Sequence, residues 1–192
     1  MKRFVVTLLF LVSTLLANSD KVDKYYKELY YLSDEQRFNM LFSYAMGYKD
    51  GNDLGLTLAA IAWKESAFDK YPINLEDGKY GSFSMYHVVL DYAAIRNNKT
   101  TMWSKSRLAE TLIRDKKFAA EEAIGILKFF GNRKGCDWKC SVASYNVGSI
   151  GLKSKKGLAY AEDVSYRVKA LDRYFNNQKI YDKIHREVFG EK

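Results

Sequence analysis

Residues 54–66 read LGLTLAAIAWKES, an apolar run that is interrupted by Gly55 and Thr57 and ends in the polar triplet KES. Because the run is apolar on every side, it predicts a helix buried within a core rather than one that lies on a surface. On such a helix Glu65 shares a face with the apolar residues three, four and seven positions before it. We therefore expect a core helix that carries a single carboxyl group at its polar end.

Helical spacing of apolar residues recurs on both sides of this run. Upstream, Ser33 to Gln36 has the pattern of a capping box, followed by core-facing residues between Phe38 and Ala45. Downstream, helical patterns cover Phe83–Ile95, Leu108–Ile113, Phe118–Phe130 and Val142–Tyr145, and a last apolar stripe runs from Ala161 to Phe175. Asp77-Gly78 favours a tight turn. The expected fold is all-α, or α with a minor β-hairpin, and residues 20–192 contain no repeat or linker that would divide a single domain.

The composition suits a globular chain. Of 192 residues, 47% are hydrophobic and 15% aromatic, which is enough for a packed core and too apolar for disorder. The formal net charge is +8, and basic chains favour polyanions such as nucleic acid, anionic lipid or cell-wall polymer. The lysines and arginines are dispersed without a basic arm, so nucleic acid is not an expected partner.

Residues 1–19 have the organisation of a secretory signal peptide. Met1-Lys2-Arg3 is a short positive start, an apolar run extends from Phe4 to Ala17, and Ala17-Asn18-Ser19 resembles a cleavage site. The run is shorter than the about 20 apolar residues of a membrane span. We expect export to the periplasm or cell envelope, with an uncleaved anchor as the alternative.

Cys136 and Cys140 are the only cysteines in the sequence. Zinc prefers four ligands and neither His87 nor His185 lies nearby in the sequence, so no metal and no cofactor are expected. An oxidising compartment favours a local disulfide between the two cysteines. Closing so short a loop lowers the entropy of the unfolded chain only slightly, so the disulfide should stabilise the fold little. Two reduced, buried thiols are the alternative.

Glu65 is the residue whose surroundings best suit chemistry. A carboxyl group at the end of a buried apolar helix loses hydration, which favours its protonated form. A glycosidase needs a carboxyl group in that form as its proton donor near neutral pH. The alternative is a glutamate at a helix end that faces solvent or pairs with a lysine.

Four short blocks follow one another within residues 58–168, about two-thirds of the mature chain: AIAWKESAF (60–68), YGSFSM (80–85), ASYNVG (143–148) and YAEDV (160–164). In this order they resemble the Glu-Ser motif, the glycine–apolar–glutamine block, the Ala-Tyr-Asn-Ala-Gly block and the closing tyrosine block of the soluble lytic transglycosylase family, part of the lysozyme-like superfamily. The short gap between the last two blocks is similar to that of the small specialised members that serve secretion, conjugation or pilus systems.

The resemblance implies a lysozyme-like helical domain that cleaves the β-1,4 bond between N-acetylmuramic acid and N-acetylglucosamine in peptidoglycan and leaves a 1,6-anhydro sugar. Glu65 matches the sole catalytic carboxylate, which protonates the glycosidic oxygen and then takes the proton of the sugar's own 6-hydroxyl. Ser66 matches a residue placed to hydrogen-bond near it. Tyr145 and Asn146 match residues that line the cleft. Tyr160 matches a tyrosine whose hydroxyl reaches the catalytic carboxylate.

The chain departs from this family at Ser84, where the family usually has glutamine. Serine is shorter and offers one hydroxyl, so a contact to the sugar or to Glu65 is lost. The departure concerns substrate placement and rate rather than the reaction class, and Met85 and Tyr86 are candidates to fill part of the gap. Ordinary helix-start packing is the alternative interpretation of residues 81–86.

Other functions stay open. Glu76 and Asp77 would supply the second carboxylate of a hydrolytic, lysozyme-type muramidase, although Asp77-Gly78 also suits a simple turn. Loss of the family glutamine would suit a catalytically impaired scaffold protein that binds peptidoglycan. His87 has no nucleophile partner in the sequence and is interpreted as a helix residue near the cleft. The expected partners are peptidoglycan glycan strands and a cell-envelope secretion or conjugation machine.

Overall fold

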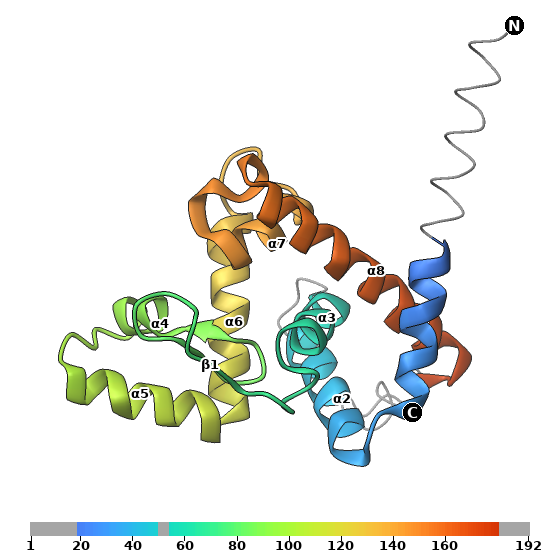
Figure 1. The fold of residues 1–192 in the computed structure, drawn as a ribbon, viewed down its shortest axis with the longest axis horizontal. Coiled ribbons are helices and arrows are strands. Elements are labelled where there is room, and N and C mark those ends of the chain that lie inside the picture. Colours follow the sequence, from blue (N-terminus) through green and yellow to red (C-terminus); the bar gives the residue numbers. More distant parts are fainter. Residues whose placement is uncertain (1–18, 50–53, 181–192) are drawn as a thin grey trace, which may run out of the picture. The chain divides into compact units, whose positions relative to one another are not determined.

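The computed structural model describes residues 19–49 and 54–180, so nearly all of the expected signal segment lies outside the described residues. Over these residues the chain is mostly helical (Figure 1). It also contains one small three-stranded antiparallel sheet. This confirms the prediction of a helical fold with a minor β element. Within the described ranges, none of the helices combines the length and apolar character that crossing a membrane requires.

The order of the elements along the chain follows the predicted helices closely except at residues 83–89. Residues 19–28 are helical and are followed by η1 (Leu29–Tyr31), α2 (Asp34–Lys49), α3 (Gly55–Ser66), β1 (Ile73–Asn74), β2 (Ser82–Phe83), β3 (Val88–Val89), α4 (Leu90–Arg96), α5 (Met102–Arg114), α6 (Lys116–Gly131), α7 (Trp138–Val147), η2 (Gly148–Lys153) and α8 (Lys155–Asn177). The capping box is present, because Ser33 N–H donates to Gln36 Oε1 and Gln36 N–H donates to Ser33 Oγ.

The chain forms two compact units. One comprises residues 33–165, and the other comprises the segments up to Leu32 and from Tyr166, so α8 begins in the first unit and ends in the second. Within the second unit, Arg173 Nη1 lies 2.6 Å from Asp23 Oδ1. Every candidate site residue belongs to the unit of residues 33–165. The single domain expected over residues 20–192 stays a prediction.

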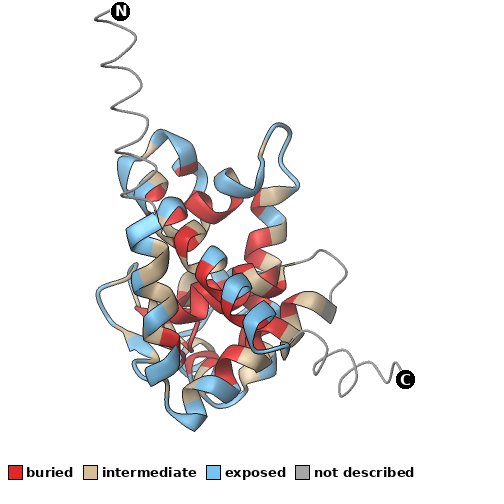
Figure 2. Ribbon diagram, turned by 90° about the vertical axis from the view of Figure 1, so that its right-hand side faces the viewer, coloured by how far each residue is buried: buried red, intermediate tan, exposed pale blue. Residues whose placement is uncertain are grey.

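Helix α3 is the buried helix that the apolar run predicts. Residues 58–62 are all 0% exposed, and they are among the buried residues coloured red in Figure 2. Helix α2 packs closely on α3, since a Cβ atom at Gly55 would lie only 2.8 Å from the Tyr44 ring. The helix ends where Ala67 adopts a left-handed conformation with φ 51° and donates its N–H to the Trp63 carbonyl. Glu65 therefore lies in the last turn of the core helix.

The sheet is a meander in which β1 pairs with β2 and β2 pairs with β3, both antiparallel. The turn between β1 and β2 contains Asp77-Gly78, as the sequence predicts, and Gly78 has a φ of 60°. Asp77 Oδ2 accepts hydrogen bonds from Asn74 Nδ2 at 2.9 Å and from Ser82 Oγ at 2.7 Å. The Asp77 carboxylate thus organises this hairpin.

The predicted helix over Phe83–Ile95 is wrong in its first half. Phe83 ends β2, Val88 begins β3, and a helix starts only at Leu90. The turn between the strands holds Ser84 at φ 78° and His87 at φ 46°, conformations that a right-handed helix does not contain. The apolar residues of this segment are buried by a turn between two strands rather than by a helix face.

Candidate active site

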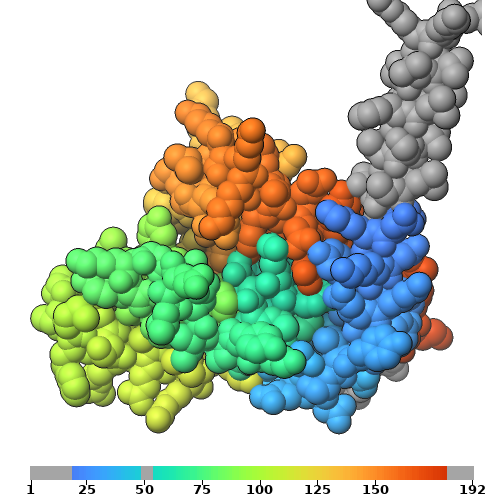
Figure 3. All heavy atoms as spheres, viewed as in Figure 1, coloured from blue at the N-terminus to red at the C-terminus, as the bar shows by residue number. Residues whose placement is uncertain are grey.

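Glu65 lines a cavity of about 320 Å³. The other lining residues come from the β1–β2 and β2–β3 turns, from β3 and α4, and from α7 and the starts of η2 and α8: Glu76, Asp77, Gly78, His87, Val89, Tyr92, Tyr145, Asn146, Val147, Gly148 and Lys156. Figure 3 shows the segments that form these walls next to each other, the β1–β3 region in green and residues near 150 in orange. The Glu65 side chain is 14% exposed, so it is recessed yet open to the cavity.

Tyr160, on α8, holds one oxygen of Glu65. Its hydroxyl donates a hydrogen bond of 2.5 Å to Glu65 Oε1, and the tyrosine is 6% exposed. A short bond from a hydroxyl to a carboxylate is among the stronger hydrogen bonds in proteins and stabilises the ionised acid. The contact joins the end of α3 to the first turns of α8.

A second link between α3 and α8 lies next to this bond. Lys64 Nζ lies 2.9 Å from Asp163 Oδ2, with side-chain exposures of 27% and 18%. The same ammonium group lies 5.3 Å from the centre of the Tyr160 ring, within the range of a cation–π interaction. Lys64 therefore helps to keep the Tyr160 hydroxyl on Glu65.

His87 approaches the other oxygen of Glu65. Its Nδ1 atom lies 3.2 Å from Glu65 Oε2, although the angle is not that of a directed hydrogen bond. On the opposite side of the ring, Nε2 lies 2.8 Å from the Tyr71 carbonyl oxygen. Burial lowers the pKa of His87, but the Glu65 carboxylate, the Tyr71 carbonyl and the charge of Asp77 together outweigh burial and leave the pKa raised above its ordinary value.

Tyr145 and Asn146, at the end of α7, both line the cavity. The Tyr145 hydroxyl donates to the Tyr86 carbonyl at 2.8 Å, and burial together with the charge of Glu65 raises the pKa of Tyr145 well above its ordinary value. Asn146 Oδ1 is buried and accepts no hydrogen bond from the described residues. A buried acceptor without a donor is costly, so a ligand with an N–H or O–H group would gain by meeting it.

Ser66, Ser84 and Met85 lie behind the cavity rather than in its wall. Ser66 is fully buried, donates from Oγ to the Met85 carbonyl at 2.8 Å and accepts from the Asp69 N–H at 2.7 Å. Ser84 Oγ accepts from the Tyr86 N–H within its own turn. The Met85 side chain is 2% exposed and its sulfur faces Ser43. These residues fasten the turn after β2 to the end of α3.

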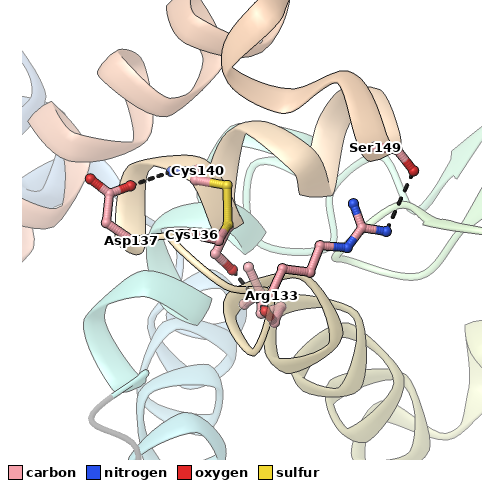
Figure 4. The surroundings of a disulfide bond; sticks show 7 residues. Arg133, Cys136, Asp137, Cys140 and Ser149 are labelled. Atoms are coloured by element: carbon pink, nitrogen blue, oxygen red, sulfur yellow. Dashed lines mark hydrogen bonds between the residues drawn. A yellow bond between two sulfur atoms is a disulfide. The ribbon is translucent and has the colours of Figure 1, made fainter.

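The disulfide lies at another cavity. Cys136 and Cys140 are joined by a disulfide, and Asp137 caps α7 by accepting the Cys140 N–H at 2.8 Å (Figure 4). Cys136 and Asp137 line a larger cavity of about 480 Å³ that does not include Glu65. Within the described ranges, no group of three or more His, Cys, Asp or Glu side chains is placed to hold a metal ion.

The structure places the Tyr160 hydroxyl against Glu65, and Tyr145 and Asn146 line the same cavity as Glu65. The sequence did not predict the contact between His87 and Glu65, and no motif or spacing signals it. No family model, curated protein or solved structure matches the chain.

Proposed function

We propose that this protein is an exported, lysozyme-like lytic transglycosylase that cuts peptidoglycan glycan strands in the cell envelope, with Glu65 as its acid and base. The observation that carries the proposal is the hydrogen bond from Tyr160 to Glu65 at 2.5 Å. These residues come from two blocks 95 positions apart, and the sequence resemblance matches them to a catalytic carboxylate and the tyrosine that supports it. Glu65 lines a cavity, and its contact with Tyr160 supports the proposal.

In the proposed reaction the protonated Glu65 carboxyl group gives its proton to the glycosidic oxygen. The bond between C1 of N-acetylmuramic acid and that oxygen breaks, and its electron pair stays on the leaving hydroxyl. The 6-hydroxyl of the same sugar then attacks C1 and gives its proton to the Glu65 carboxylate, so the acid is restored and no water is consumed. The Tyr160 hydrogen bond stabilises Glu65 while it carries the negative charge.

The cavity wall supports an amide-bearing sugar as substrate. The unpartnered Asn146 Oδ1 is suited to accept a hydrogen bond from an N-acetyl N–H or a sugar hydroxyl. A single carboxylate suffices for bond cleavage because the N-acetyl group of the substrate is able to stabilise the positive charge that develops at C1. Lys156 adds a positive charge to the same wall.

Product analysis on purified peptidoglycan sacculi tests the proposal. The purified protein should release soluble muropeptides that end in 1,6-anhydro sugars, identified by mass spectrometry. The Glu65→Gln variant should lose this activity, whereas Glu110→Gln, which changes a 55%-exposed carboxylate on α5, should keep it. Equal clearance by the unmodified protein and Glu65→Gln would overturn the role of Glu65, and binding without cleavage by both would favour a scaffold protein that binds peptidoglycan.

A hydrolytic muramidase is the second candidate, because Glu76 and Asp77 line the same cavity as Glu65. A second carboxylate is able to activate water or to form a covalent intermediate. Asp77 is already bonded to Asn74 and Ser82, which leaves Glu76 as the better placed of the two. Reducing sugar ends in the product, and their loss in Glu76→Gln, would establish this candidate over the transglycosylase.

The choice of partner machine follows from the same proposal. The spacing of the sequence blocks is similar to that of small enzymes that serve secretion, conjugation or pilus systems, so we propose local opening of the wall for such a machine. Expression of the protein with the Glu65→Gln substitution should then block assembly of that machine while leaving the wall otherwise intact.

A further inference from the structure

The position of His87 determines which of its nitrogens carries a proton. Nε2 lies 2.8 Å from the Tyr71 carbonyl oxygen, and a carbonyl oxygen is only an acceptor. Nε2 must therefore be the donor in this contact. The neutral form of His87 in this fold has its proton on Nε2 and a bare lone pair on Nδ1.

Nδ1 is the ring nitrogen that lies beside the carboxyl group of Glu65. Nδ1 lies 3.2 Å from Glu65 Oε2 and has no hydrogen-bond partner elsewhere in the described residues. With His87 neutral and Glu65 ionised, two lone pairs would face each other at this distance in a site where the His87 side chain is 7% exposed. A proton between the two groups, on either nitrogen or oxygen, removes the repulsion.

We propose that Glu65 and His87 share one proton, and that His87 is a positioning residue that keeps this proton available to Glu65 at near-neutral pH. The shared proton is a property of the fold alone. Its consequence for catalysis rests on the proposed function. A proton held between two groups in such close contact belongs to the pair rather than to either residue.

The charges around His87 favour holding the proton. The titratable groups that face it across the cavity or pack beside it are Glu65 on α3, Glu76 and Asp77 in the β1–β2 turn, Tyr92 on α4, Tyr145 on α7, and Lys156 at the start of α8. Three of these are carboxylates and one is an ammonium group, so the local field stabilises an imidazolium ion. Burial lowers the pKa of His87, and the Glu65 carboxylate, the hydrogen bond to the Tyr71 carbonyl and the Asp77 charge together raise it by more.

The Tyr160 hydrogen bond selects the resting position of the proton. Because the hydroxyl donates to Glu65 Oε1, it stabilises the carboxylate, and the proton rests on His87 Nδ1. A sugar that fills the cavity displaces water, and a neutral pair is then favoured over two separated charges. The Nδ1–H bond breaks, an Oε2–H bond forms, and Glu65 becomes the acid. After the reaction Glu65 has regained a proton from the sugar hydroxyl and returns it to His87, so the protons balance.

Titration of the imidazole by nitrogen NMR tests the shared proton without any substrate. The chain has two histidines, and the spectrum of His87→Asn assigns the signal. Asparagine is a suitable replacement because it tolerates the positive φ of this position. In the unmodified protein His87 should titrate above its ordinary pKa and, when neutral, carry its proton on Nε2. In Glu65→Gln the pKa of His87 should fall, because the opposite charge that favours the imidazolium ion is gone. Equal titration in the two proteins, or a neutral form protonated on Nδ1, would overturn the proposal.

The pH dependence of muropeptide release tests the role of His87 in the reaction. In His87→Asn the loss of activity with rising pH should begin at a lower pH than in the unmodified protein. If its midpoint moves down by one pH unit, the rate on the alkaline side should fall by about tenfold. A purely structural role would lower the rate by one factor at every pH and would contradict the inference.

Two controls separate this inference from the proposed function. Circular dichroism shows whether His87→Asn is folded. If it is not, the NMR titration of the unmodified protein and of Glu65→Gln still tests the shared proton. If the unmodified protein is inactive but the Glu65→Gln substitution lowers the pKa of His87, only the proposed function is rejected. If the protein is active but His87 titrates equally in both proteins, only the shared proton is rejected.

Discussion

Replacing Ser66 by alanine removes the hydroxyl that connects the end of α3 to the turn holding His87. Ser66 Oγ donates to the Met85 carbonyl at 2.8 Å and accepts from the Asp69 N–H at 2.7 Å, and the residue is fully buried. The alanine variant leaves one donor and one acceptor without partners. Each unpaired buried group costs about 1–3 kcal/mol, and because Asp69 is only half-buried the expected sum is about 2–4 kcal/mol. For a chain of this size that corresponds to a fall in Tm of roughly 4–16 °C.

Urea unfolding followed by circular dichroism measures this loss, with Ser141→Ala as the matched control. Ser141 is also a buried serine, and its Oγ donates to the Leu127 carbonyl at 2.7 Å. That carbonyl lies within α6 and keeps its helical partner, so the control should lose only about 0.5–1.5 kcal/mol. A Ser66→Ala variant that is no less stable than Ser141→Ala would refute the view that this hydroxyl holds the site together.

Three further outcomes are expected. Tyr160→Phe should slow muropeptide release by roughly 10–100-fold, because a hydrogen bond to a charged group contributes about 1.5–3 kcal/mol; an unchanged rate would show that the contact with Glu65 is not used. Reduction of the disulfide between Cys136 and Cys140, which are 4 positions apart, should lower the free energy of unfolding by only about 2 kcal/mol in urea titrations, and complete unfolding would contradict this. The pKa of His87 is raised in the folded protein despite burial. The unmodified protein should therefore be more stable than His87→Asn below about pH 6.5 and should lose this advantage as pH rises through the raised pKa. A difference in unfolding free energy that grows with pH would contradict this prediction.

The helices were predictable because their signals are local. The apolar run before Glu65 predicts α3, and the reciprocal bonds between Ser33 and Gln36 follow from a pattern four residues long. Asp77-Gly78 predicts its turn because glycine adopts the positive φ of 60° found there. Each of these elements depends on residues that are neighbours in the sequence.

The segment after β2 was predicted wrongly because its conformation is determined by distant groups. Its apolar residues suit a helix or a buried turn equally well. The Met85 carbonyl meets Ser66 Oγ, and Ser84 and His87 adopt positive φ values of 78° and 46°. Such backbone conformations persist only where surrounding structure enforces them, and the surroundings are absent from a local pattern.

The amino-acid order alone determined that a carboxyl group would end a buried helix and that a tyrosine block would follow far along the chain, since hydrophobic periodicity and residue identity are properties of the chain itself. Only the tertiary structure decided which atoms meet that carboxyl group. The Tyr160 hydroxyl and the His87 ring reach opposite oxygens of Glu65 because α8 and the β2–β3 turn pack against the same end of α3. Contacts of this kind depend on angles and distances between separate elements, which neither composition nor spacing encodes.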